Sequence, residues 1–259
     1  MSDFKKNPFV VTICSGKGGV GKSVLAANLA NVLSKKMKVL LWDANSDFPN
    51  QHIIIGVEPP VRLSEVYSGQ VNVLTAVCKL NNNFHLLADT PASGGSLTKD
   101  GKSILRVFED LLVYSDYDII IIDTPSGGSD NVLQCCNIAD LVQVVVTDEP
   151  TSIIDAYGLI KILLKMLPKK YINLFVNNVI DVEDADEITK KLNLATEKFL
   201  SVKLEVIGYI PYNREIRQSI LKQELFTKLA PKNEASLALE KIAKKLIARA
   251  KKTVVQMSN

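Results

Sequence analysis

The sequence predicts a three-layer, doubly wound α/β fold, in which a mostly parallel β-sheet carries helices on both faces. Short apolar, β-branched runs alternate with longer segments of helical periodicity throughout the 259 residues. Most of the short runs are apolar at every position, as expected for strands that helices cover on each side. Hydrophobic residues make up 47% and charged residues 23% of the chain, a globular composition that excludes disordered and fibrous classes.

The alternation assigns seven strands and seven helices. The strands are expected at residues 9–14, 39–42, 84–88, 118–122, 141–146, 172–176 and 205–209. The helices are expected at residues 22–35, 103–114, 130–138, 152–167, 183–199, 214–222 and 234–252. Pro168 ends the fourth helix and Pro231 separates the last two, because proline cannot continue a helix. No linker, composition shift or repeat divides the chain, so we expect a single domain over residues 1–259.

Charge, hydropathy and cysteine usage indicate a cytoplasmic protein. The 31 basic and 28 acidic residues leave a net charge of +3, too small to indicate nucleic-acid or membrane binding through overall charge. The longest apolar runs, such as 119–122 and 141–146, are too short to span a membrane. Residues 1–8 lack the apolar core of a signal peptide. Four cysteines without CxxC spacing favour a reducing compartment: Cys14, Cys78, Cys135 and Cys136.

A glycine-rich loop follows the first expected strand. Residues 16–23 read Gly-Lys-Gly-Gly-Val-Gly-Lys-Ser and fit the phosphate-binding pattern G-x-x-x-x-G-K-[ST]. Glycines let successive backbone N–H groups turn toward phosphate oxygens, and the helix that follows adds partial positive charge at its N-terminus. Lys22 is expected to hold the β- and γ-phosphates, and the Ser23 hydroxyl to bind Mg²⁺. The expected nucleotide-binding residues of this loop are Gly16, Lys17, Gly18, Gly19, Val20, Gly21, Lys22, Ser23 and Val24.

The run from Lys17 to Ser23 resembles the deviant Walker A motif of the MinD/ParA family of P-loop NTPases. In that family the additional lysine, here Lys17, reaches across an ATP-bound homodimer to the partner's phosphates. A cation from a second subunit stabilises charge on the transferring phosphoryl group, as an arginine finger does. The resemblance implies catalytic roles for Lys17 and Lys22, and it places Asn177 and Pro211 where relatives contact adenine.

Two strand ends carry carboxylates that the resemblance assigns to the metal site. Asp123 opens a segment, Asp-Thr-Pro-Ser-Gly, that is similar to the family's Walker B and switch II region. A carboxylate there can hold a water on Mg²⁺, while Gly127 lets the backbone approach the γ-phosphate. Asp43 ends the second expected strand and is implied to support the same metal. The expected metal residues are therefore Ser23, Asp43 and Asp123.

The chain departs from the family pattern at Asn45, where an Asp-x-Asp element would place a second carboxylate that positions the attacking water. An amide can hydrogen-bond to water but cannot take up its proton. Loss of a general base costs about 10²–10⁴-fold in rate. We therefore expect slow hydrolysis of ATP to ADP and phosphate, with Asp47 close in sequence but displaced from the motif. The alternative is a scaffold that stays ATP-bound and does not hydrolyse.

Two stretches resemble the flagellar-number regulators of the family (FlhG-, FleN- and YlxH-like) more than its partition proteins. They are residues 50–57, Asn-Gln-His-Ile-Ile-Ile-Gly-Val, and residues 149–157, Glu-Pro-Thr-Ser-Ile-Ile-Asp-Ala-Tyr. Thr151 or Ser152 would also suit the N-cap of the next helix. This resemblance implies a switch that positions a cellular structure such as the flagellum, or regulates its number, with a flagellar or other cargo protein as partner. Adjacent Cys135 and Cys136 lack the CxxC spacing of the family's iron–sulfur carriers.

The last expected helix, residues 234–252, is amphipathic and basic. Its apolar stripe is Leu239, Ile242, Ala243, Leu246, Ile247 and Ala250, and lysines and Arg249 occupy much of the rest. We expect the stripe to pack on the sheet and the basic face to be solvated. The alternatives are weak peripheral contact with the inner face of the cell membrane, as in relatives, and nonspecific DNA binding by a partition ATPase.

Overall fold

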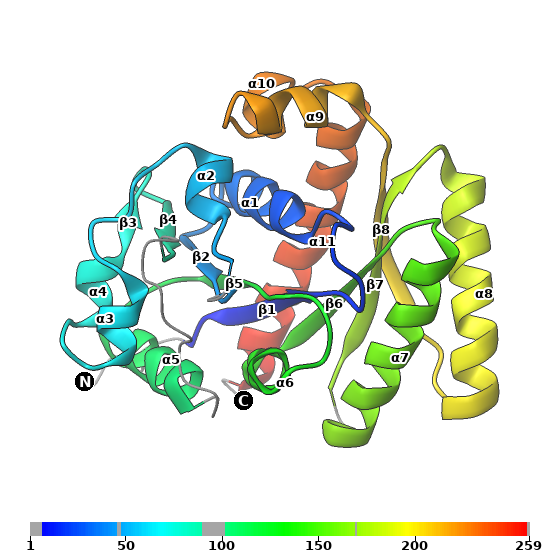
Figure 1. Ribbon diagram of the computed structural model, residues 1–259, viewed down its shortest axis with the longest axis horizontal. Helices are drawn as coiled ribbons and strands as arrows, with labels where there is room; N and C mark the ends of the chain where they lie inside the picture. The colour runs from blue at the N-terminus through cyan, green and yellow to red at the C-terminus, as the bar shows by residue number, and fades with distance from the viewer. Residues whose placement is uncertain (1–6, 46–47, 90–101, 169, 258–259) are drawn as a thin grey trace.

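The computed structural model describes residues 7–45, 48–89, 102–168 and 170–257, and its strands form one eight-stranded sheet between two layers of helices (Figure 1). The strand order is β3-β4-β2-β5-β1-β6-β7-β8. Every neighbouring pair is parallel except β3 and β4, which are antiparallel. The strands are β1 (Phe9–Cys14), β2 (Val39–Asp43), β3 (Cys78–Lys79), β4 (Phe84–Leu87), β5 (Ile119–Asp123), β6 (Leu141–Val146), β7 (Ile172–Val179) and β8 (Glu205–Pro211).

The helices divide between the two faces of the sheet. They are α1 (Lys22–Leu33), α2 (Gln51–Ile55), α3 (Leu63–Tyr67), α4 (Val73–Ala76), α5 (Lys102–Tyr114), α6 (Asp130–Ile138), α7 (Pro150–Met166), α8 (Val182–Leu200), α9 (Arg214–Leu221), α10 (Phe226–Leu229) and α11 (Glu234–Met257). Helices α3 to α8 bury their apolar residues in one core, and α1, α10 and α11 bury theirs in the other. Alternate residues of each central strand enter opposite cores, as the pleat requires. The predicted doubly wound fold is confirmed.

All seven expected strands and all seven expected helices are present, with shifted ends. Strand β5 includes Asp123, β7 continues to Val179 and β8 continues to Pro211. The prediction that Thr151 or Ser152 caps the fourth helix is wrong, because α7 begins at Pro150 and its N-cap is Glu149. Proline suits the first helical position, since its missing N–H has no partner there. The hydroxyl of Ser152 instead accepts a hydrogen bond from the backbone N–H of Thr147 (3.0 Å).

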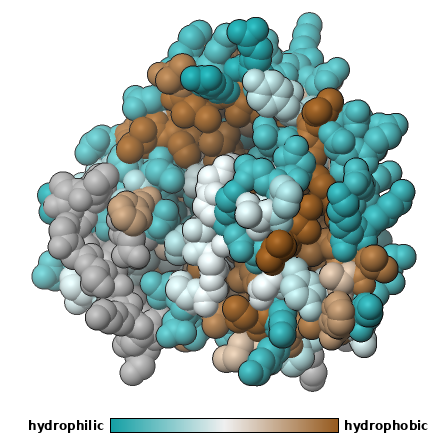
Figure 2. Space-filling model, turned by 45° about the vertical axis from the view of Figure 1, so that its right-hand side comes forward, coloured by the Kyte–Doolittle hydropathy of each residue, from teal (hydrophilic) through white to brown (hydrophobic). Residues whose placement is uncertain are grey.

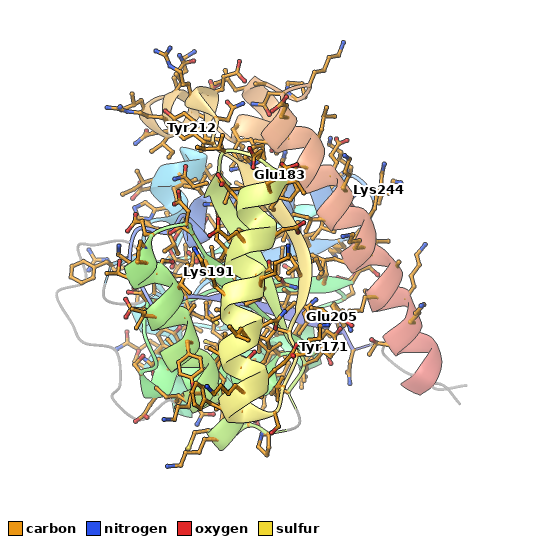
Figure 3. The ribbon with its side chains drawn as sticks, turned by 90° about the vertical axis from the view of Figure 1, so that its right-hand side faces the viewer. Tyr171, Glu183, Lys191, Glu205, Tyr212 and Lys244 are labelled. Carbon is orange, nitrogen blue, oxygen red and sulfur yellow. The ribbon has the colours of Figure 1, made fainter. Side chains whose placement is uncertain are left out.

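Helix α11 packs on the sheet, as expected from its apolar stripe. Leu239, Ile242, Ala243, Leu246 and Ala250 are each at most 3% exposed and lie in the core shared with α1. Part of the basic face is also engaged: Lys245 donates to the carbonyl of Ile207 (2.7 Å), and the Arg249 guanidinium lies 3.5 Å from the centre of the Tyr171 ring. Lys244 projects outward from the same helix (Figure 3). Among the described residues, no helix is long and apolar enough to cross a bilayer.

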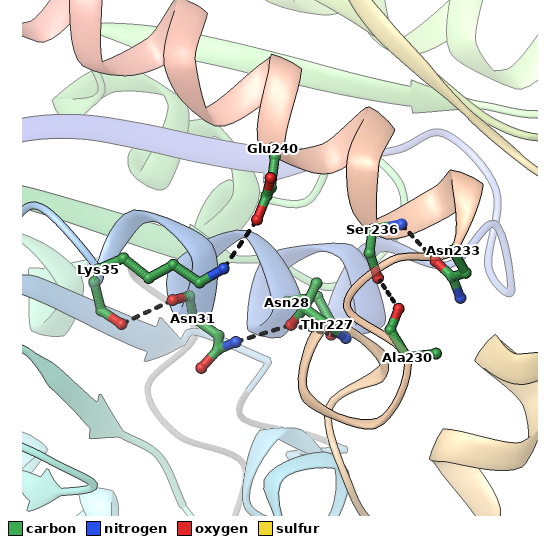
Figure 4. A network of polar contacts seen from close by, with 9 residues as sticks. Asn28, Asn31, Lys35, Thr227, Ala230, Asn233, Ser236 and Glu240 are labelled. Atoms are coloured by element: carbon green, nitrogen blue, oxygen red, sulfur yellow. Dashed lines mark hydrogen bonds and ion pairs between the residues drawn. The ribbon is translucent and has the colours of Figure 1, made fainter.

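A polar network joins the helix after the glycine-rich loop to the C-terminal helices (Figure 4). The side-chain oxygen of Asn28 in α1 accepts from the backbone N–H and the hydroxyl of Thr227 in α10, both at 3.0 Å. Asn31 donates to the same hydroxyl (2.9 Å), and Lys35 pairs with Glu240 of α11 (2.9 Å). The polar groups of this network find their partners within the protein, and their hydrogen bonds hold α1 against α10 and α11.

Candidate nucleotide-binding site

The glycine-rich loop joins β1 to α1 at the carboxyl edge of the sheet. Gly19 (φ +79°) and Gly21 (φ +92°) adopt left-handed conformations, which glycine reaches without strain. Gly21 is the residue that precedes helix α1. A Cβ on Gly16 would lie 2.1 Å from the backbone oxygen of Asp155 in α7, so this position has no room for a side chain. The glycine pattern therefore matches real backbone requirements of the loop.

Lys22 begins α1 and is buried beneath the loop. Its ammonium donates to the Ser15 hydroxyl (2.9 Å), which in turn donates to the carbonyl of Lys17 (2.6 Å). Burial lowers the pKa of Lys22, and the charge of Asp123 opposes this shift. A buried ammonium has three donors, so Lys22 keeps bonding capacity for a phosphate.

Parallel pairing brings Asp43 and Asp123 together, because they are opposite each other in the register of β2 and β5. The Asp43 carboxylate accepts three backbone N–H groups: Asn45 (3.1 Å), Asn50 (2.8 Å) and Gln51 (2.9 Å). Burial, reinforced by the charge of Asp123, nevertheless raises the pKa of Asp43 to about 7. Two buried carboxylates at one edge of the sheet concentrate negative charge there when they are ionised, and a bound cation would offset this charge.

Asp123 lies between the loop and helix α2. One carboxylate oxygen accepts from the side-chain amide of Gln51 (2.8 Å), and the Ser23 hydroxyl also lies against this carboxylate. Burial raises the pKa of Asp123, while Ser23, Gln51 and Lys22 act in the opposite direction. Within the described structure, Oδ1 of Asp123 and Oε1 of Gln51 are buried without a hydrogen-bond partner. Carboxylate, hydroxyl and amide oxygens suit Mg²⁺, so the residues fit this ion.

Two adjoining cavities open beside the loop. The larger, about 420 Å³, lies over Lys22 and Ser23 and is also bordered by Asn45 and by residues 124–126. The second, about 240 Å³, contains Asn177 and Pro211 together with Val20 and Phe226. Both cavities share Gly19, Gly21, Val24 and Ile220. The two cavities are therefore continuous above the loop, and we call the larger one, over Lys22 and Ser23, the phosphate cavity.

Asn177 connects the second cavity to the loop. Its side-chain amide donates to the carbonyl of Val20 (2.8 Å), and it lies close enough to Gly21 that a Cβ there would approach it to 2.5 Å. Gly127 (φ +87°) borders neither cavity but donates from its backbone N–H to the carbonyl of Ser15 (2.8 Å). The segment from Asp123 to Gly127 is thereby tied to the loop.

Lys17 lines neither cavity, although its partner Glu149 borders the second one. Its ammonium pairs with Glu149 and donates to the Thr151 hydroxyl (2.9 Å) at the start of α7. The Lys17 side chain is 32% exposed and that of Glu149 is 58% exposed. Within one chain, the Lys17 side chain therefore contacts α7 and its N-cap and not the group formed by Lys22, Asp43 and Asp123.

Asn45 borders the phosphate cavity, where its side-chain amide donates to the carbonyl of Phe48 (2.9 Å). Phe48 is 80% exposed. Asp47, the acidic residue close to Asn45 in sequence, lies outside the described residues. Gln51 and Glu149 belong to no site motif, and the sequence indicates only that they lie in stretches of family similarity. The available sequence signal for Gln51 was a polar side chain two residues before the apolar run 53–55.

Exposed apolar side chains lie beside the phosphate cavity. Ile53 of α2 and Ile220 of α9 are each 44% exposed, and Leu221 is 76% exposed. Apolar side chains gather on the upper part of the face shown in Figure 2. Ile54 and Ile220 also border the cavity itself. The mouth of the site is therefore partly apolar.

Comparison with known proteins gives one family. The matching profile is that of ParA, described as NUBPL iron-transfer P-loop NTPase, and it covers residues 7–247. The antiactivator FleN of Pseudomonas aeruginosa is 30% identical over 92% of this chain and 85% of its own length. The flagellum site-determining protein YlxH of Helicobacter pylori is 30% identical over 95% and 84%, respectively. The septum site-determining protein MinD of Pyrococcus horikoshii, solved with Mg-ADP, is similar in structure with a TM-score of 0.78, at 22% identity over 93% of this chain and 96% of that one.

Proposed function

Because the chain belongs to the ParA family of P-loop NTPases and is similar to MinD, we propose that it is an ATP-dependent dimerisation switch. The observation that carries this proposal is the division of the cationic groups. Lys22 lies under the phosphate cavity of its own chain, whereas Lys17 lies outside it at the rim. A cation at the rim can serve a nucleotide held by a second copy.

The residues of the loop would bind the nucleotide. Backbone N–H groups of residues 16–23 and the Lys22 ammonium would hold its phosphates, while Asn177 and Pro211 border the chamber for adenine. Ser23, Asp43 and Asp123 would hold Mg²⁺, which neutralises phosphate charge when bound. The buried carboxylate pair, with the raised pKa of Asp43, suits a site that a cation completes.

Lys17 would have to leave Glu149 and Thr151 before it could reach a partner subunit. The Lys17–Glu149 pair is partly exposed, and such pairs contribute only about 0–1 kcal/mol. Breaking this ion pair to release Lys17 would therefore cost little free energy. Dimerisation on ATP would move Lys17 to the partner's phosphates, and hydrolysis would free it again.

The cellular role we propose is that of its flagellar relatives. FleN is named an antiactivator and YlxH a flagellum site-determining protein. We accordingly propose a flagellar or other cargo protein as partner, and action in the cytoplasm with at most weak peripheral membrane contact. The iron-transfer role in the family description has little support here, because Cys135 and Cys136 are adjacent and buried.

Asn45 favours slow hydrolysis, and it is equally compatible with the second candidate function, a scaffold that stays bound to ATP. The residue borders the phosphate cavity, but an amide cannot take a proton from water. Phosphate release tests the two functions: purified protein is incubated with Mg²⁺ and ATP, alone and with anionic vesicles or DNA. A switch releases phosphate slowly and dissociates afterwards, whereas a scaffold forms an ATP dimer without release. Stimulation by DNA would favour a partition ATPase instead.

A further inference from the structure

We propose that Gln51 is a positioning residue, which holds the Asp123 carboxylate in place for the metal of the nucleotide site and ties that site to helix α2. The inference rests on the proposed function, because it assumes that Mg²⁺ binds with the nucleotide. It concerns a residue that the P-loop and strand-end motifs do not include.

Gln51 makes contact with all three elements that carry the expected metal residues. Its side-chain Nε2 donates to Oδ2 of Asp123 (2.8 Å) at the end of β5 and to the carbonyl of Ser23 (3.0 Å) in α1. Its backbone N–H donates to Oδ2 of Asp43 (2.9 Å) at the end of β2. The residue is fully buried, with 0% exposure. One side chain therefore bridges the loop helix and a carboxylate, while its backbone holds the other carboxylate.

The orientation of the Gln51 amide follows from its partners. Both groups at Nε2 are acceptors, a carboxylate and a carbonyl, so exchanging the amide nitrogen and oxygen would set two oxygens against the acceptors. With Nε2 committed to these bonds, Oε1 must point elsewhere. Within the described structure, Oε1 is buried without a hydrogen-bond partner, and so is Oδ1 of Asp123.

Buried oxygens without partners are unfavourable unless a donor or a cation satisfies them. Two such oxygens belong here to side chains that are hydrogen-bonded to each other, and both residues are 0% exposed. Gln51 fixes Oδ2 of Asp123 by a donated bond, which leaves Oδ1 as the oxygen available to the metal or its water. Groups that orient a ligating carboxylate in this way set metal affinity without binding the metal themselves.

The length of the side chain is part of the argument. Gln51 opens a five-residue helix whose backbone is held by Asp43, so the amide must extend from α2 to reach β5. Asparagine is one methylene shorter and could not span the same gap from the same backbone position. Methionine has a similar length but no donor for Asp123 or Ser23.

The experiment titrates Mg²⁺ into protein that holds a fluorescent, nonhydrolysable ATP analogue, and it also measures affinity for the analogue in EDTA. Gln51→Met should raise the Mg²⁺ concentration for half-maximal effect by about 10- to 100-fold. Its affinity for the analogue in EDTA should stay within about twofold of the unmodified protein. Gln51→Asn should shift the Mg²⁺ requirement in the same direction and serves if Gln51→Met does not fold.

His52→Leu is the matched control, because His52 is also buried in α2 but has no hydrogen bond to the metal residues in the described structure. It should leave the Mg²⁺ requirement unchanged. An unchanged Mg²⁺ requirement in both Gln51 variants would overturn the positioning role. An equal loss of affinity in EDTA and in Mg²⁺ would also overturn it, since that pattern indicates general disruption of α2. Failure of the unmodified protein to bind the analogue would instead reject the proposed function.

Discussion

Replacing Asp43 by asparagine should flatten the pH dependence of stability in the metal-free protein. Burial and the charge of Asp123 raise the pKa of Asp43 from 3.8 to about 7. Between these values the folded protein keeps a proton that the unfolded chain has released. Stability conferred by this proton is therefore fully present below the unfolded pKa and is lost as pH rises toward about 7.

The size of the effect follows from proton linkage. A single proton bound only by the folded state changes stability by about 1.4 kcal/mol per pH unit. Across the window from 3.8 to about 7, the loss is on the order of 4 kcal/mol. Asp43→Asn has no such proton, and its amide leaves at least one of the three backbone donors without an acceptor. That cost, about 1–3 kcal/mol, is independent of pH. The test therefore compares how the free energy of unfolding changes with pH in the two proteins, and not the constant difference between them.

Urea unfolding in EDTA, without nucleotide, measures the free energy of unfolding of both proteins from about pH 5 to about pH 8. The variant should gain on the unmodified protein as pH rises, and most of the gain should occur below about pH 7. Parallel pH profiles, with a constant difference between the two proteins, would show that Asp43 is ionised throughout and would refute the reasoning.

Two further predictions concern the nucleotide. Asn45→Asp should accelerate single-turnover hydrolysis in preformed dimers by up to about 10²-fold, because it restores the carboxylate that can position the attacking water. Equal rates in both proteins would show that this departure from the family pattern does not limit hydrolysis. Lys22→Ala should abolish ATP binding measured by calorimetry, because it removes the buried ammonium beneath the phosphate cavity; undiminished affinity would reject the loop as the nucleotide site.

The fold could be predicted from the sequence because its main elements are long and periodic. Seven strands and seven helices were found, and apolar runs such as Leu141–Val146 are buried along their whole length. The short elements β3, α2, α3, α4 and α10 were missed. A helix of four or five residues completes little more than one turn, too short for the spacing of apolar residues to distinguish it from a loop.

The candidate site was only partly predictable for a related reason. The glycine-rich loop and Asp123 have local motifs, and the pairing of β2 with β5 brings Asp43 beside Asp123. The contact of Lys17 with Glu149 joins residues 132 positions apart, so it depends on tertiary structure that no local motif encodes. Gln51 is similar, since its amide reaches Asp123 only because α2 folds back over the ends of β2 and β5.

The central claim is that Lys17 acts on a nucleotide held by a second copy of the chain. Light scattering of the protein with Mg²⁺ and a nonhydrolysable ATP analogue tests it directly, with Lys17→Ala compared at the same concentration and calorimetry confirming that each protein holds nucleotide. The account predicts a dimer for the unmodified protein and a nucleotide-bound monomer for Lys17→Ala. A dimer of normal affinity in Lys17→Ala, or a monomer in the unmodified protein with nucleotide bound, would contradict it.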